Sequence, residues 1–150
     1  MDFEKIKQLS PDELKAIPIE ELTTSVFIQN YLKENGTTKE VVDRKVHRIK
    51  YTYSGTHDEL GGEFVRLVDA REGRHPGNIT HYTAPGTLLH FAACEEEPLL
   101  VRYLLVVCKA NCRSVFGGAK RYPPIFTPLR VAAVNDNPQT MEILQEWYLL

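Results

Sequence analysis

Cysteine and long apolar runs are scarce in this sequence. Three of its 150 residues are cysteines (Cys94, Cys108 and Cys112), an odd number without the regular spacing of a disulfide framework. This usage is typical of a reducing compartment, so we expect an intracellular, cytoplasmic protein. The longest apolar stretch, residues 99–108, is interrupted by Arg102 and falls short of the roughly 20 residues that a membrane helix needs. We therefore expect no membrane span.

The sequence also lacks a strong excess of charge of either sign. Lysine and arginine together number 18, against 20 aspartates and glutamates, which gives a net charge of −2. A nucleic-acid-binding domain usually has a basic excess, so we expect no nucleic-acid partner. With 43% hydrophobic residues, the composition is that of a folded globular domain and not of a disordered chain.

Recognisable catalytic and cofactor motifs are absent as well. The sequence contains no G-x-S-x-G, phosphate loop, H-E-x-x-H or dinucleotide fingerprint. We therefore expect a non-enzymatic protein that needs no cofactor. The alternative is an enzyme with an unrecognised active site in residues 1–83, for which His75 and His81 are the candidate residues.

Four residues carry the sulfur and nitrogen atoms that bind zinc in proteins. They are His90, Cys94, Cys108 and Cys112, which form one H-x3-C pair and one C-x3-C pair. This spacing is too loose for a tetrahedral zinc site, and cysteine is a common small core residue. We expect no bound metal.

Helix caps, apolar periodicity and breakers predict a chain of helices. Ser10 and Pro11 form a helix start, and Gly36 ends the helix that follows. Apolar residues at helical spacing continue this pattern. We expect helices at 11–17, 24–35, 38–50, 58–70, 88–95, 98–107, 128–134 and 139–149. Residues 71–86 are expected to form a loop or β-hairpin and residues 109–126 a loop, so the expected fold class is all-α.

Two segments of the C-terminal half match each other in register. They are Thr87-Leu88-Leu89-His90-Phe91-Ala92-Ala93 and Thr127-Pro128-Leu129-Arg130-Val131-Ala132-Ala133, which lie 40 residues apart. A leucine follows each threonine by 17 residues, at Leu104 and Leu144. Both segments resemble the ankyrin signature T-P-L-H-x-A-A, in which threonine caps the first helix and small alanines let the paired helices approach closely. The distance of 40 residues exceeds the family's roughly 33, so the resemblance implies divergent repeats with an elongated finger.

The resemblance implies an all-α fold, a short ankyrin-like helical solenoid of about three repeats with long fingers. Residues 1–37 would form an N-terminal helical cap and residues 38–83 a degenerate repeat without the signature. Residues 84–123 and 124–150 would be the signature-bearing repeats, the last of them incomplete. The residues expected in the core between the helices are Leu88, Leu89, Ala92, Leu104, Leu129, Ala132 and Leu144.

Ankyrin repeats bind proteins through their fingers and the exposed face of each first helix, so the resemblance implies a protein-protein interaction module. Residues 109–126, called the basic segment below, contain four cations and no acid, a net charge of +4. Arginine and aromatic side chains are enriched at binding hot spots. We expect an acidic protein partner to contact this segment and the earlier loop over 71–86, which would lie beside it in a stacked array. The expected contact residues are Arg74, His75, Tyr82, Arg113, Phe116, Lys120, Arg121 and Tyr122.

The N-terminal residues offer an alternative function. Leu9-Ser10-Pro11-Asp12-Glu13-Leu14, followed by Ile17 and Leu22, resembles the start of an F-box. That resemblance implies a ubiquitin-ligase adaptor or a secreted effector, which would act in the host cytoplasm. An ordinary capped helix explains the same residues.

The C-terminal residues are apolar where the outer face of a terminal repeat normally turns polar. They include Trp147, Leu149 and Leu150. Self-association through these three residues is therefore a further expectation.

Overall fold

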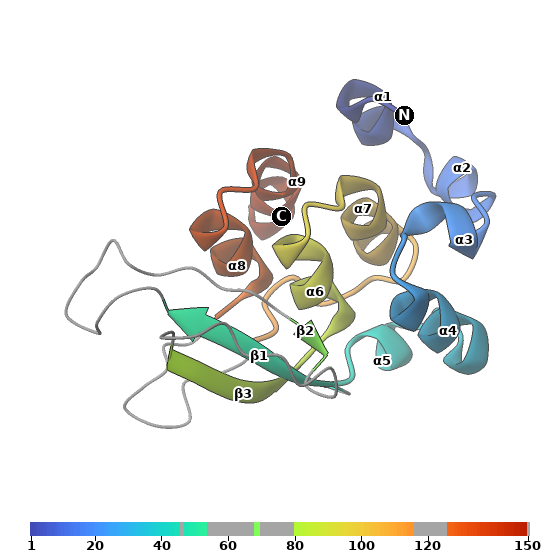
Figure 1. Cartoon of the computed structure of the whole chain (residues 1–150). Helices are drawn as coiled ribbons and strands as arrows, with labels where there is room; N and C mark the ends of the chain where they lie inside the picture. The colour runs from blue at the N-terminus through green and yellow to red at the C-terminus, as the bar shows by residue number, and fades with distance from the viewer. Residues whose placement is uncertain (46, 54–67, 70–79, 116–125, 150) are drawn as a thin grey trace.

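Helices dominate the structure, a computed structural model that describes residues 1–45, 47–53, 68–69, 80–115 and 126–149 (Figure 1). The helices before the sheet are α1 (Phe3–Gln8), α2 (Pro11–Lys15), α3 (Ile19–Leu22), α4 (Val26–Asn35) and α5 (Lys39–Val42). The strands are β1 (His47–Tyr53), β2 (Val68–Asp69) and β3 (Thr80–Gly86). The helices after the sheet are α6 (Leu88–Cys94), α7 (Pro98–Val106), α8 (Pro128–Val134) and α9 (Pro138–Tyr148).

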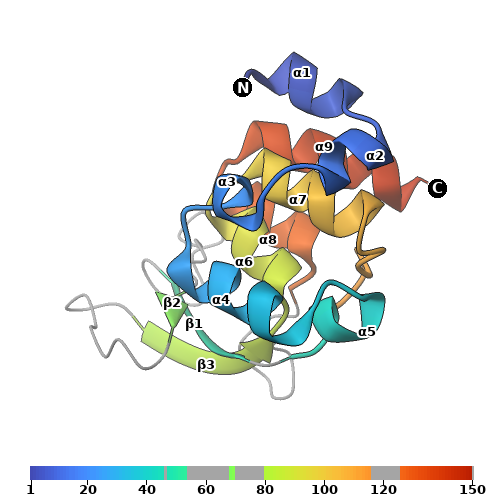
Figure 2. The same ribbon diagram turned by 90° about the vertical axis from the view of Figure 1, so that its right-hand side faces the viewer.

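Helices α6 to α9 form two stacked pairs. Within the pairs α6 contacts α7 and α8 contacts α9, and between the pairs α6 packs against α8 and α7 against α9. Figures 1 and 2 show α6 and α8 in one row and α7 and α9 in a second row. Helix α3 packs against α7, and the ring centroids of Phe27 in α4 and Phe91 in α6 lie 6.4 Å apart. The N-terminal helices therefore extend both rows.

The first helices of the two pairs, α6 and α8, begin in the same way. Oγ1 of Thr87 accepts a hydrogen bond from the backbone N–H of His90 at 3.4 Å. Oγ1 of Thr127 accepts from the backbone N–H of Arg130 at 3.2 Å. Each threonine satisfies a donor that has no partner inside its helix, as expected of an N-cap.

The same two helices also end in the same way. Glu96 and Asp136, each just past its helix, have left-handed backbones with φ of 50° and 55°. The backbone N–H of Glu97 donates to the carbonyl oxygen of Ala92 at 3.3 Å, and that of Asn137 donates to the carbonyl oxygen of Ala132 at 3.0 Å. These bonds close the last turn, and a proline at the first position of α7 and of α9 starts the second helix. The 40-residue match thus extends from the caps through both connecting turns.

Most of the residues expected in the core are buried between the helix rows. The buried ones are Leu88, Leu89, Ala92, Leu104, Ala132 and Leu144, as predicted. Leu129 packs against this core but is only partly buried. Its equivalent in α6, Leu89, is fully buried. In the same way, Ala93 of α6 is buried, whereas its equivalent Ala133 in α8 is exposed. Helix α8 covers α6, whereas no helix of the described residues covers the far side of α8.

A three-stranded antiparallel sheet with strand order β2-β1-β3 leads into α6. Strands β1 and β3 pair along their whole length, from His47 opposite Gly86 to Tyr53 opposite Thr80. The described part of the chain is mostly helical, but it also contains this sheet, which the prediction of an all-α fold did not include.

The sheet replaces part of a predicted helix. The helix expected over 38–50 is confirmed only for α5, and β1 begins at residue 47. The segment has apolar residues at helical spacing, but Ile49, Tyr51 and Tyr53 also recur at every second position. Such alternation of β-branched and aromatic residues favours a strand once a partner strand is available, and β3 provides that partner.

The structure describes only part of residues 58–86, for which a helix and a loop or β-hairpin are expected. The helix expected over 58–70 was wrong for residues 68 and 69, which belong to β2, and residues 58–67 and 70 lie outside the described residues. Of residues 71–86, expected to form a loop or β-hairpin, residues 80–86 form the strand β3, which pairs with β1 and not within this stretch, and residues 71–79 lie outside the described residues.

The N-terminal residues are helical, as predicted, but in shorter pieces. Ser10 and Glu13 form a capping box. The backbone N–H of Glu13 donates to the Ser10 hydroxyl at 3.1 Å, and the backbone N–H of Ser10 donates to the Glu13 carboxylate at 3.0 Å. Ser25 caps α4, and Gly36 ends it with a φ of 93° that suits glycine. Helices α1 and α3 were not predicted from the sequence.

Candidate functional site

The structure describes two of the eight predicted contact residues. Arg113 lies in the turn after α7 and is exposed, and Tyr82 lies in β3, where it pairs with Tyr51 of β1. The others lie outside the described residues: Arg74, His75, Phe116, Lys120, Arg121 and Tyr122. Of the two candidate residues for catalysis, His81 lies in β3 and His75 falls outside the described part. Of the basic segment, the structure therefore describes the two ends, residues 109–115 and residue 126.

The basic segment leaves α7 through a tight turn. Lys109 has a left-handed backbone with φ of 61°, and the N–H of Ala110 donates to the carbonyl oxygen of Leu104 at 2.9 Å. Ala110 is buried, whereas Lys109 and Asn111 are exposed. A left-handed residue other than glycine is uncommon, and here the turn is held by the bond to α7 and by the buried alanine.

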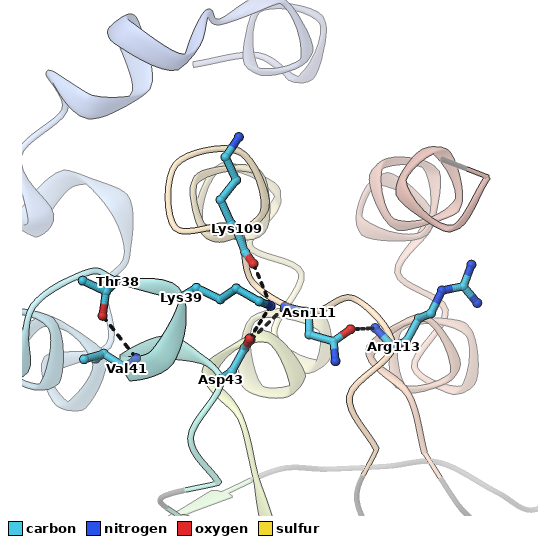
Figure 3. A network of polar contacts seen from close by, with 7 residues as sticks. All are labelled: Thr38, Lys39, Val41, Asp43, Lys109, Asn111 and Arg113. Carbon is cyan, nitrogen blue, oxygen red and sulfur yellow. Dashed lines mark hydrogen bonds and ion pairs between the residues drawn. The ribbon is translucent and has the colours of Figure 1, made fainter.

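Helix α5 and the turn after it attach this end to the N-terminal part of the chain (Figure 3). The backbone N–H of Asn111 donates to Oδ1 of Asp43 at 2.8 Å. Nζ of Lys39 donates to Oδ2 of Asp43 at 2.7 Å and to the carbonyl oxygen of Lys109 at 3.2 Å. One carboxylate and one ammonium group therefore hold two nearby points of the turn, although Lys39 and Lys109 are 70 positions apart in the sequence.

A second set of contacts attaches the same turn to α9. The side chain of Asn111 accepts from the backbone N–H of Arg113 at 2.9 Å. The guanidinium of Arg113 donates to the carbonyl oxygen of Tyr148 at 2.8 Å, and its carbon lies 4.7 Å from the centre of the Tyr148 ring. A guanidinium over an aromatic face is attracted by the ring's quadrupole. Arg113 thus positions the basic segment, a role that was not predicted from its sequence context.

His90 fixes the other end of the basic segment. Its Nε2 lies 3.2 Å from the carbonyl oxygen of Phe126, and its Nδ1 lies 2.9 Å from Oγ1 of Thr87. Because a carbonyl oxygen only accepts, Nε2 carries the proton and Nδ1 accepts from Thr87. Burial lowers the pKa of His90 to about 4, so the ring is neutral at pH 7. The described residues on both sides of 116–125 are therefore attached to the helical scaffold.

The thiols have no arrangement that indicates catalysis. Cys108 is buried, and burial raises the pKa of its thiol to about 12, which keeps it protonated. Cys94 and Cys112 are half-buried. Within the described ranges, no group of three or more His, Cys, Asp and Glu side chains is placed to hold a metal ion.

The apolar C-terminal residues differ in exposure. Leu149 is 88% exposed, whereas Trp147 packs against the core and is partly buried. Leu150 lies outside the described residues. Of the three residues expected to mediate self-association, Leu149 is the one that the structure places at the surface.

Comparisons with protein-family models, with curated proteins and with solved structures find no match for this chain. None of the helices in the described residues has the length and apolar character needed to cross a membrane.

Proposed function

We propose that this chain is a non-enzymatic protein-interaction module of divergent ankyrin-like repeats, and that its basic segment binds an acidic protein partner. Ankyrin-like repeats are proposed because the 40-residue match covers two cap threonines, two left-handed turn residues and two prolines that start the second helices. Repeat arrays of this kind present loops along one edge and commonly use them for binding.

The way in which the basic segment is attached carries the proposal. Asp43 and Tyr148 hold its beginning, and His90 holds its end, through bonds of 2.8, 2.8 and 3.2 Å. Fixed ends reduce the conformational entropy that a loop loses on binding, and a smaller loss raises affinity. Three separate attachments, at α6, at α9 and at the turn after α5, therefore favour a binding role for the segment.

Charge supports the class of partner. The segment has a net charge of +4 in a chain whose total is −2. Such a separation attracts an acidic surface and speeds encounter with it. We further propose that the module acts in the cytoplasm, since its three cysteines are all free thiols.

Affinity capture tests the proposal against its alternatives. The wild-type chain and the double variant Lys120→Glu, Arg121→Glu are immobilised at equal density and exposed to cytosol at low salt. We expect one defined acidic protein to bind the wild-type chain and to be lost from the variant. The matched control is Lys5→Glu, Lys15→Glu, which changes the net charge equally at exposed positions of α1 and α2.

Two other outcomes would overturn the proposal. Capture of ubiquitin-ligase scaffold subunits that depends on residues 1–22 and not on the basic segment would favour the F-box-like adaptor. Reproducible turnover of a nucleotide, ester, peptide or glycoside that is lost on changing His75 or His81 would show that the chain is an enzyme.

A further inference from the structure

A groove of about 410 Å³ lies between the N-terminal helices and the first turn of α7. Its apolar lining includes Ile6 of α1, Leu22 of α3 and Leu99 of α7. Helices α1 and α3 both pack against α7, which fixes the walls relative to each other. The residues that line the groove differ from those of the basic segment, which leaves α7 at its opposite end.

Three carboxylates line the same groove, from Glu20, Glu21 and Glu97. The carboxylate of Glu20 forms an ion pair with Lys33. Within the part of the chain that the structure describes, Glu21 and Glu97 form no ion pair. The groove therefore combines an apolar lining with two carboxylates whose charge is not balanced by an ion pair among the described residues.

The carboxylate of Glu97 is desolvated and fixed in place. Its Oε1 accepts a hydrogen bond of 2.8 Å from the hydroxyl of Thr23, which is itself buried. Burial raises the pKa of the Glu97 carboxyl above its ordinary value, and the bond from Thr23 opposes part of that rise. A cationic group placed beside this carboxylate would offset its desolvation better than the neutral hydroxyl does.

We propose that the groove is a second docking site, which takes an amphipathic, cationic segment of a protein partner. Apolar side chains of that segment enter the lining formed by Ile6, Leu22 and Leu99, and its lysines or arginines pair with Glu21 and Glu97. The size suits a few side chains and not a whole domain, as in the docking of one helix face into a groove. The chain thus has two binding surfaces of opposite charge preference, and this inference does not depend on the function proposed for the basic segment.

Three synthetic peptides of about five helical turns test this site by fluorescence anisotropy against the full chain. One has an amphipathic leucine-lysine pattern, the second replaces lysine with glutamate, and the third replaces leucine with serine. We expect saturable binding of the leucine-lysine peptide, and binding at least about tenfold weaker for the other two, because each lacks one of the two complementary features. Methyl chemical shifts of Leu22 and Leu99 should move on addition of the first peptide.

A pair of variants locates the binding. The double variant Glu21→Lys, Glu97→Gln should weaken the leucine-lysine peptide at least about fivefold, since both carboxylates are lost while the amide oxygen introduced by Glu97→Gln can still accept from Thr23. The matched control Glu34→Lys, Glu40→Gln makes the same charge change at exposed positions of α4 and α5 and should leave affinity within about twofold. Helix content and melting are measured for both, and Glu21→Lys alone replaces the double variant if Glu97→Gln disturbs folding.

The proposal is overturned if no peptide binds saturably, or if the leucine-glutamate peptide binds as tightly as the leucine-lysine peptide. It is also overturned if the two double variants weaken binding equally, which would indicate attraction to the acidic surface in general. Shifts confined to residues of the basic segment would place the peptide elsewhere and overturn it as well.

Discussion

Replacing Leu104 with alanine perturbs the hydrophobic core between the two helix rows. Leu104 is fully buried in α7, where it belongs to the core that also contains Leu100 and Leu144. Truncation removes the end of the side chain from a closely packed site and leaves a cavity, because the surrounding helices relax only in part. We expect a loss of about 2–5 kcal/mol in the free energy of unfolding.

The measurement is equilibrium denaturation by urea, followed by far-ultraviolet circular dichroism, with thermal melting as a second readout. For a chain of this size, the expected loss corresponds to a fall of about 4–20 °C in the melting temperature. Leu144→Ala, at the equivalent position of α9, should cause a loss in the same range, since Leu144 is also fully buried. The matched control is Leu149→Ala, whose side chain is 88% exposed and should contribute less than about 0.5 kcal/mol. If Leu104→Ala costs no more than the control, the helix pairs are not packed in this register.

Three further changes test the attachments of the basic segment. The pKa of His90 falls from 6.5 to about 4 on folding, so the unfolded state binds more protons than the folded state between these two values. The contribution of the neutral ring to the free energy of unfolding is fully present above about pH 6.5. It should fall by up to about 3 kcal/mol as the pH is lowered towards 4. The stability difference between wild type and His90→Gln should shrink over the same interval, and a pH-independent difference would contradict the buried neutral ring. Asp43→Ala should cost about 1 kcal/mol and speed hydrogen exchange at the Asn111 amide, and unchanged exchange there would exclude the bond. Arg113→Ala should loosen the end of α9, seen as faster amide exchange near Tyr148, whereas equal exchange in wild type and variant would show that Arg113 does not hold α9.

Local sequence signals were sufficient to predict α6 to α9. Threonine caps, prolines at first helical positions and apolar spacing act within a few residues, so they can be read without knowledge of the fold. The strand β1 was missed because its residues satisfy both a helical and an alternating pattern, and its pairing with β3 joins residues far apart in the sequence. Leu129 packs against the core as predicted but is only partly buried, because the extent of burial depends on a covering helix, which is a property of the array and not of the segment.

The candidate site was only partly predictable for the same reason. Composition revealed the concentration of cations in residues 109–126. The bond between Asp43 and Asn111 spans 68 residues, and no spacing rule indicates such a pair. Arg113 was interpreted as one of several exposed contact residues, whereas its contact with Tyr148 depends on α9 ending beside the turn after α7.

The proposed contact between the basic segment and an acidic partner is tested by measuring their affinity. The dissociation constant of the captured partner is measured for three chains: wild type, Lys120→Glu with Arg121→Glu, and the control Lys5→Glu with Lys15→Glu. We expect the first double reversal to weaken binding at least about tenfold, equivalent to about 1.4 kcal/mol, while both variants melt like wild type. Wild-type affinity should also fall as salt is raised. If the double reversal in the basic segment binds as tightly as wild type at low salt, or if the control reversal weakens binding equally, the basic segment is not the contact surface.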